Sequence, residues 1–207
     1  MTETAPPARP DEDSPKRRQI LEGARRAFME KGFDASSMQD VARAAGVSKG
    51  TLYVYFDNKE AMFEALVLCE CDRLQAAIRE IASGGGAVGD ELLAIARQML
   101  TTLMQTEVLR AMRMVIGTGE KFPDLARKVY EAGPLRASGT LAEYLAGRVA
   151  RGDLCIDDCA AASAEFLDLV LSGQQRRALL MMPPPTDAAL QDHVARRVGL
   201  FLRVYGA

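Results

Sequence analysis

Residues 36–56 read SSMQDVARAAGVSKGTLYVYF, and this stretch decides how the rest of the chain is interpreted. Ser37 followed three residues later by Asp40 is a variant of the capping box that begins a helix. Gly46 is placed to end that helix in a left-handed turn, and Ser48 is placed to cap a second one. Two short helices joined by a tight turn are predicted, which is the form of a helix-turn-helix.

Helical patterns continue on both sides of this stretch. Before it, apolar residues recur with helical spacing up to a stop at Gly32. After it, Asp57 and Asn58 can cap a longer helix. Beyond the SGGGAVG break at 83–89, helices are predicted over 90–105, 107–118, 123–151, 157–181 and 187–204, with a weak point at Gly133-Pro134. No segment shows the signals of a strand or hairpin, so the predicted fold class is all-α.

Composition narrows the function. The 207 residues carry a net charge of −2, yet residues 14–60 hold nine Lys or Arg against six acids, a local +3 that suits DNA. Residues 1–15, rich in proline and acids, are predicted to be a disordered leader. The sequence shows neither a membrane-spanning run nor a signal peptide, which favours a cytoplasmic protein. One histidine and two close cysteine pairs predict no metal site, no disulfide framework and no cofactor.

The outward side of the second short helix offers the groups that a DNA groove recognises. Val47 and Leu52 are placed to anchor its underside, and Lys49, Gly50, Thr51, Tyr53 and Tyr55 remain outward. A helix-turn-helix presents such a set to the major groove. Taken one at a time, these residues are equally consistent with ordinary caps and a solvated helix face.

The segment VARAAGVSKGTLYVYFDNKEAMF, residues 41–63, resembles the N-terminal signature of the TetR family of transcriptional repressors. The resemblance covers about residues 16–66, and FPDLARKVYEAGPLRASGTLAEYLAGRVARGDL, residues 122–154, is similar to the AefR-like subgroup. It implies a helix-turn-helix DNA-binding domain over 16–60 and a helical ligand-binding and dimerisation domain over 61–207. The expected protein is a homodimeric repressor that a small apolar effector releases from a palindromic double-stranded DNA operator.

The resemblance also assigns individual residues. Those matching positions that touch DNA in the family are Gln39, Lys49, Gly50, Thr51 and Tyr53, and those matching its phosphate contacts are Ser37, Ser48, Tyr55 and Lys59. Gln pairs well with adenine and Lys with guanine or phosphate, while hydroxyls at helix starts suit phosphate oxygens.

Two further sets of residues are expected in the second domain. Apolar residues that could line an effector pocket, or equally belong to the core, are Met99, Leu103, Met112, Phe122, Tyr130 and Phe166. The helix from Asp157 is apolar on most of its circumference and must be covered from more than one side. The expected homodimer interface, with a wholly intramolecular core as the alternative, comprises Leu169, Val170, Val194, Val198 and Phe201.

Three other functions would each need different features of the sequence. A redox-sensing regulator would use the pairs Cys69/Cys71 or Cys155/Cys159, although Asp157 and Asp158 oppose activation of the second pair. A protein-binding adaptor would keep the fold without binding DNA. An enzyme would need catalytic residues, and the sequence offers no nucleophile-and-base pair, phosphate loop or metal cluster, so no catalytic residue is predicted.

Overall fold

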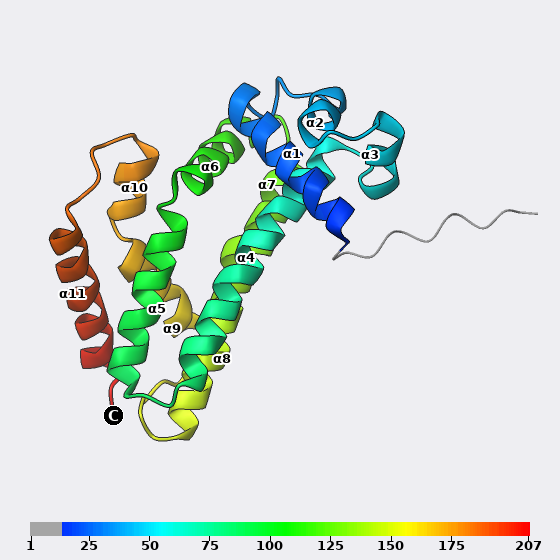
Figure 1. Ribbon diagram of the computed structural model, residues 1–207. Helices are drawn as coiled ribbons and strands as arrows, with labels where there is room; N and C mark the ends of the chain where they lie inside the picture. The colour runs from blue at the N-terminus through cyan, green and yellow to red at the C-terminus, as the bar shows by residue number, and fades with distance from the viewer. Residues whose placement is uncertain (1–13) are drawn as a thin grey trace, which may run out of the picture. The chain divides into compact units, whose positions relative to one another are not determined.

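The computed structural model describes residues 14–207, and within that range it confirms the all-α fold (Figure 1). The only β-type pairing described is a single bridge between Leu154 and Gly206. The chain forms two compact units that divide between Val67 and Leu68. The division lies seven residues after the predicted boundary at 60/61, inside a long helix.

The first unit contains α1 (Pro15–Lys31), α2 (Met38–Ala45), α3 (Lys49–Tyr55) and the first turns of α4 (Lys59–Ser83). Ser14 caps α1 and Pro15 is its first residue, so the helix begins inside the predicted leader. The rest of that leader, residues 1–13, lies outside the described residues. The apolar stripe of α1 is buried as predicted, at Ile20, Leu21, Ala24, Ala27 and Phe28.

Helix α2 is fixed closely against α1. A side chain on Gly23 would overlap the backbone of Ala45, so glycine is needed there for the two helices to approach. The carbonyls at the end of α2 receive hydrogen bonds from α1, since Gln19 donates to Ala45 (2.7 Å) and Arg26 donates to Ala44 (2.5 Å). Gly46 then ends α2 in the left-handed conformation (φ 65°), as the sequence predicted.

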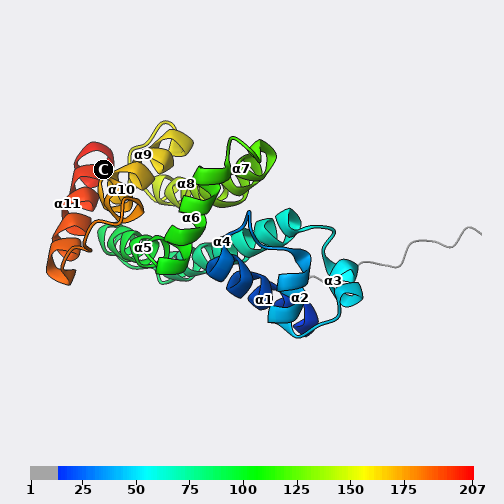
Figure 2. The same ribbon diagram turned by 90° about the horizontal axis from the view of Figure 1, so that it is seen from above.

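The second unit contains the remainder of α4 and the helices that follow it. These are α5 (Val88–Leu103), α6 (Thr106–Thr118), α7 (Pro123–Tyr130), the π-helix η1 (Glu131–Leu135), α8 (Arg136–Ala150), α9 (Cys159–Leu171), α10 (Gln174–Leu179) and α11 (Asp187–Tyr205). Helix α9 packs between α8 and α11 (Figure 2). Its Phe166 meets Phe201 of α11 edge-to-face with ring centroids 5.1 Å apart, at the centre of this unit's core.

Two helices differ from their predicted extent. At the predicted weak point the chain does not break, but widens into the π-helix η1 around Pro134, whose ring would clash with the carbonyl four residues earlier in a regular α-helix. The helix predicted over 157–181 is two helices, because Gly173 adopts a positive φ of 77° between α9 and α10. No described helix combines the length and the apolar character needed to cross a membrane.

A buried ion pair joins four segments of the second unit. Arg148 on α8 pairs with Glu91 on α5, with Asp153 (2.9 Å) and with the carbonyl of Gly86 (3.0 Å). The Tyr144 hydroxyl also donates to Glu91 (2.9 Å). Burial acts to raise the pKa of Glu91, but the hydrogen bonds from Arg148 and Tyr144 outweigh it and the net shift is downward. The carboxylate is therefore charged and paired at neutral pH.

Candidate nucleic-acid interface

Helix α3 has one buried anchor and an open outer face. Leu52 is completely buried, and Phe56 at the end of the helix is 5% exposed. Lys49 and Gly50 are exposed, and Tyr53 is 46% exposed. Lys49, Gly50 and Tyr53 thus face outward as predicted, and Leu52 faces inward. Val47, predicted to face inward, is half-buried, and so are Thr51 and Tyr55, which were predicted to face outward.

The start of α3 keeps a hydroxyl hydrogen available. The Ser48 hydroxyl oxygen accepts from the Thr51 amide (3.0 Å) and lies 2.8 Å from the Thr51 hydroxyl. Two hydroxyls that share one hydrogen bond use one of their two protons for it. The other proton is free to donate to an acceptor outside the protein.

The ammonium group of Lys49 is exposed on the outer face of α3. It lies 5.9 Å from the ring centroid of Tyr53, a weak cation–π contact at an exposed site. Among residues 14–207 no carboxylate pairs with Lys49. Lys49 therefore presents a full positive charge to solvent beside the Tyr53 ring.

Gly50 is not required by the fold. A side-chain carbon built at this position would meet only the Ser48 hydroxyl oxygen, at 3.8 Å, and the backbone is not in a left-handed conformation. Glycine inside a helix costs about 0.5–1 kcal/mol relative to alanine. The missing side chain leaves the outer backbone of α3 open to close approach.

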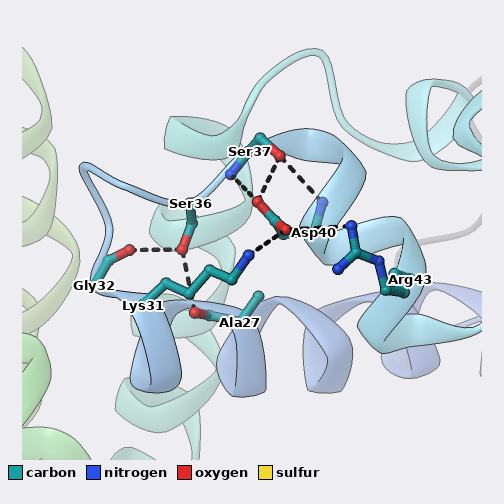
Figure 3. Close-up of polar contacts among 7 residues, drawn as sticks. All are labelled: Ala27, Lys31, Gly32, Ser36, Ser37, Asp40 and Arg43. Carbon is teal, nitrogen blue, oxygen red and sulfur yellow. Dashed lines mark hydrogen bonds and ion pairs between the residues drawn. The ribbon is translucent and has the colours of Figure 1, made fainter.

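The start of α2 is a closed polar network (Figure 3). The Ser37 hydroxyl donates to Asp40 (2.6 Å), and the Ser37 and Asp40 amides complete the capping box. Lys31 contacts the same carboxylate at 2.5 Å and Arg43 at 3.6 Å. Hydrogen bonds from Lys31 and Ser37 hold the pKa of Asp40 far below its usual range. Ser37, predicted to contact phosphate, thus already uses its hydroxyl proton, whereas Gln39 beside it is exposed.

Lys59, also predicted to contact phosphate, is half-buried, and its ammonium points to the turn between α1 and α2. Its ammonium donates to the carbonyls of Phe33 (2.8 Å), Asp34 (3.1 Å) and Ser36 (3.3 Å), all in the turn between α1 and α2. It also lies 4.6 Å from the Phe33 ring centroid. In this structure Lys59 is committed to backbone carbonyls.

The residues predicted to line an effector pocket occupy different environments. Met99 and Phe166 belong to the core of the second unit. Leu103, Met112 and Phe122 are half-buried, and Tyr130 is 59% exposed. Two of the six therefore serve as core, which was the alternative interpretation, and the pocket itself remains a proposal.

The residues assigned to the dimer interface need a correction. Four of them are at most 1% exposed within the single chain, namely Val170, Val194, Val198 and Phe201. They pack in the core between α9 and α11 and leave no surface for a second copy. Only Leu169 retains partial exposure. Apolar periodicity shows that a residue is buried, but not whether its own chain or a partner covers it.

The structure adds two residues that the sequence did not single out. Val54 is 57% exposed on α3, beside Tyr53. Gln75 on α4 is 2% exposed, and its amide nitrogen finds no hydrogen-bond partner within the described residues. The sequence gives no sign that Val54, inside an apolar helix pattern, is exposed, or that Gln75, between Leu74 and Ala76, is a buried amide without a partner. No disulfide joins the four cysteines of the described chain, and Cys155 is exposed.

Comparison with known proteins agrees with this geometry. Residues 20–66 match the family model of bacterial regulatory proteins of the TetR family, and residues 90–207 match the C-terminal domain of AefR-like transcriptional repressors. The HTH-type transcriptional repressor Rv1474c of Mycobacterium tuberculosis is 31% identical in sequence to this chain over 187 aligned residues. The alignment covers 88% of this chain and 92% of Rv1474c.

Solved structures show the same relationship. A TetR-family regulator of Mesorhizobium loti superposes with a TM-score of 0.84 at 29% identity, covering 93% of this chain and 97% of its own. The flavonoid-responsive regulator FrrA superposes with a TM-score of 0.76 at 33% identity, covering 92% and 97%. The chain has a helix-turn-helix with an open outer face, and it matches these regulators along nearly its whole length. It therefore belongs to the TetR family of transcriptional regulators, with an AefR-like C-terminal domain.

Proposed function

We propose that the chain represses transcription as a homodimer that binds a palindromic operator through α3 and leaves it when an amphipathic small molecule binds the second unit. One observation carries the proposal: Lys49, Gly50, Tyr53 and Val54 form an exposed face on a helix anchored by the buried Leu52. Within the described residues, the contact of this face that involves a charge is the weak cation–π contact between Lys49 and Tyr53. A helix-turn-helix uses such a face in the major groove.

Each group on this face has a matching group on DNA. Gln39 can pair with the edge of adenine, and Lys49 with guanine or phosphate. Val54 can contact a thymine methyl group, and the spare hydroxyl proton of the Ser48/Thr51 pair suits a phosphate oxygen. Gly50 lets the DNA backbone approach α3 closely.

The dimer is proposed to use the exposed sides of α9 and α11. Small residues on these sides, Ala161 and Ala164 on α9 and Ala195 on α11, would let helices of two copies approach closely. Gly199 on α11 has open space where a side chain would be, so the single chain does not need glycine there. Beside them lies a surface hollow of about 410 Å³ lined by Glu165, Asp168, Leu169 and Ser172, which a partner helix would fill. Two copies would supply the two reading heads that a palindrome needs.

The effector is proposed to meet Gln75. A buried amide N–H without a partner costs about 1–3 kcal/mol, and a ligand carbonyl or hydroxyl oxygen would remove that cost. The side-chain carbonyl oxygen of Gln75 already accepts a hydrogen bond from Arg79 (3.4 Å). The neighbouring Leu74 and Ile78 are buried and apolar. An apolar body with a hydrogen-bond acceptor fits these surroundings. FrrA, a relative, is named as flavonoid-responsive, which agrees with an aromatic molecule of that kind.

The DNA-binding proposal is tested by selecting duplexes from a randomised pool with the full chain. Affinity for a selected duplex is then compared between the wild type and the Lys49→Met, Tyr53→Ala double variant. The matched control is Lys128→Met, Tyr130→Ala, which removes the same charge and an exposed tyrosine from α7 in the second unit. The double variant should lose selected binding and the control should keep it. Full affinity in a folded double variant would refute the assignment.

Effector release is tested by thermal stabilisation. Flavonoids and other amphipathic aromatics that raise the melting temperature should also lower operator affinity, as linkage requires. Gln75→Leu should abolish the stabilisation by ligands that carry an acceptor, because the amide donor is gone. Ligands that bind tightly without changing operator affinity would contradict the induction mechanism and leave the DNA-binding proposal intact.

A further inference from the structure

We infer that Lys59 is a positioning residue that holds the turn before α2, and that it does not neutralise a DNA phosphate. The inference rests on the proposed DNA-binding function, because it concerns how the first unit presents α2 and α3. It also replaces the phosphate-contact role that resemblance suggested for this residue.

The ammonium of Lys59 has no hydrogen to spare. An ammonium group has three N–H donors and no acceptor. The three nearest acceptors are the carbonyls of Phe33, Asp34 and Ser36, at 2.8, 3.1 and 3.3 Å. The face of the Phe33 ring, 4.6 Å away, contacts the same cation. A phosphate oxygen could bind only by displacing one of these carbonyls.

The turn that Lys59 grips is held from two sides. On the α1 side, the Ser36 hydroxyl lies within hydrogen-bond distance of the carbonyls of Ala27 (3.1 Å) and Gly32 (2.6 Å) (Figure 3). On the α4 side, the backbone carbonyl of Ser36 accepts a hydrogen bond from Lys59. Phe33 is 1% exposed, and its ring centroid lies 5.5 Å from that of Phe63, also on α4. The first turns of α4 therefore fix the turn by both a polar and an aromatic contact.

The place of Lys59 on its helix supports the same role. It is the first residue of α4, where the helix dipole disfavours a cation. A lysine there needs compensation, and three converging carbonyl dipoles provide it. The residue after Ser36 is Ser37, the cap of α2, so a displaced turn would move the start of α2 and the exposed Gln39 with it.

Lys49 serves as the comparison for Lys59, because the Lys49 ammonium faces solvent without a carboxylate partner in the described chain. A lysine that neutralises a phosphate contributes about 0.9 to the slope of log affinity against log salt concentration. Removal of Lys49 should lower the slope by about that amount. Removal of Lys59 should weaken binding without changing the slope.

The experiment measures affinity of the full chain for a duplex selected from a randomised pool, between about 50 and 200 mM salt. Lys59→Met should reduce affinity about tenfold at every salt concentration, with the wild-type slope and a lower melting temperature. Ser36→Ala, which removes no charge, should reproduce this pattern, and Lys49→Met should show the reduced slope and an unchanged melting temperature. A Lys59→Met protein with unchanged stability and a slope lower by about 0.9 would overturn the inference.

A second measurement begins with the free wild-type protein, before any duplex is added. Nitrogen-15 NMR of the lysine ammonium groups in the free wild-type protein should show Lys59 exchanging slowly with water, because its protons are hydrogen-bonded, and Lys49 exchanging fast. Added duplex should shift the ammonium signal of Lys49 and leave the ammonium signal of Lys59 unchanged. Fast exchange at Lys59 in the free protein would overturn the inference. Absence of any selected duplex would instead refute the proposed function, and the free-protein measurement would still test Lys59.

Discussion

The two units of the molecule differ in what their sequence patterns mean. In the first unit, Lys49, Gly50 and Tyr53 were predicted to face outward and do so. In the second, Val194 and Val198 were predicted to face a partner chain and instead face their own core. Caps and turn glycines specify local backbone geometry, and that geometry fixes which side of a short helix is outward. Apolar periodicity specifies burial without naming the covering surface.

The largest expected effect separates core from interface on α11. Val198→Glu places a charge among buried apolar groups, at a cost of several kcal/mol, comparable with the total stability of a domain. The second unit should unfold, as seen in circular dichroism. Ala195→Glu, three residues earlier and exposed, should keep the wild-type melting temperature and sediment as a monomer that has lost operator affinity. A folded Val198→Glu protein that is merely monomeric would restore the original interface assignment.

The next effect concerns the buried pair Glu91–Arg148. Arg148→Met leaves the Glu91 carboxylate buried without its cation, which costs about 3–5 kcal/mol. In the wild type, the pKa of Glu91 is lower in the folded chain than in the unfolded one. Its contribution is therefore present above the ordinary glutamate pKa of about 4.3 and is lost as pH falls through the folded value.

Urea unfolding of Arg148→Met at pH 7 measures this loss, with the exposed Arg151→Met as its control. As pH falls below the ordinary glutamate pKa of about 4.3, the difference in unfolding free energy between wild type and Arg148→Met should shrink, because the pair stabilises only the charged form of Glu91. An Arg148→Met protein as stable as the wild type at pH 7 would show that the pair contributes nothing to the second unit.

The smallest effect sharpens the comparison within α3. Gly50→Ala should raise the unfolding free energy by at most about 0.5–1 kcal/mol, since alanine is the better helix former and its methyl group would meet only the Ser48 hydroxyl oxygen, at 3.8 Å. The same methyl group should weaken operator binding by blocking close approach of the DNA backbone. Thermal unfolding and DNA titration of one variant measure both. Equal affinity with raised stability would mean that Gly50 is not near DNA.

Most element boundaries followed from local chemistry. The capping box at Ser37, the turn at Gly46 and the cap at Ser48 appear where the sequence placed them. The break at Gly173 was missed because an isolated glycine after an apolar helix can sit inside a helix or end it, and only tertiary packing decides.

The sequence predicted that Lys49, Gly50 and Tyr53 of α3 are exposed, but not which polar side chains form hydrogen bonds inside the protein. Lys59 and Lys49 are both basic residues in the matched signature, and nothing in the sequence separates the one that grips carbonyls from the one that faces solvent. The orphan amide of Gln75 likewise depends on what surrounds α4, which no local pattern encodes. Residues whose role depends on distant backbone atoms need the structure.

The central claim is that two copies of α3 read one duplex through their outward side chains. Hydroxyl-radical footprinting on a selected duplex, with the stoichiometry measured by sedimentation, tests it most directly. Two chains per duplex are expected, with two symmetric protected segments about 34 Å apart or a small multiple of that. The Lys49→Met, Tyr53→Ala variant should remain dimeric and leave no footprint. One chain on a single unsymmetric segment, or an unchanged footprint in the variant, would contradict the account.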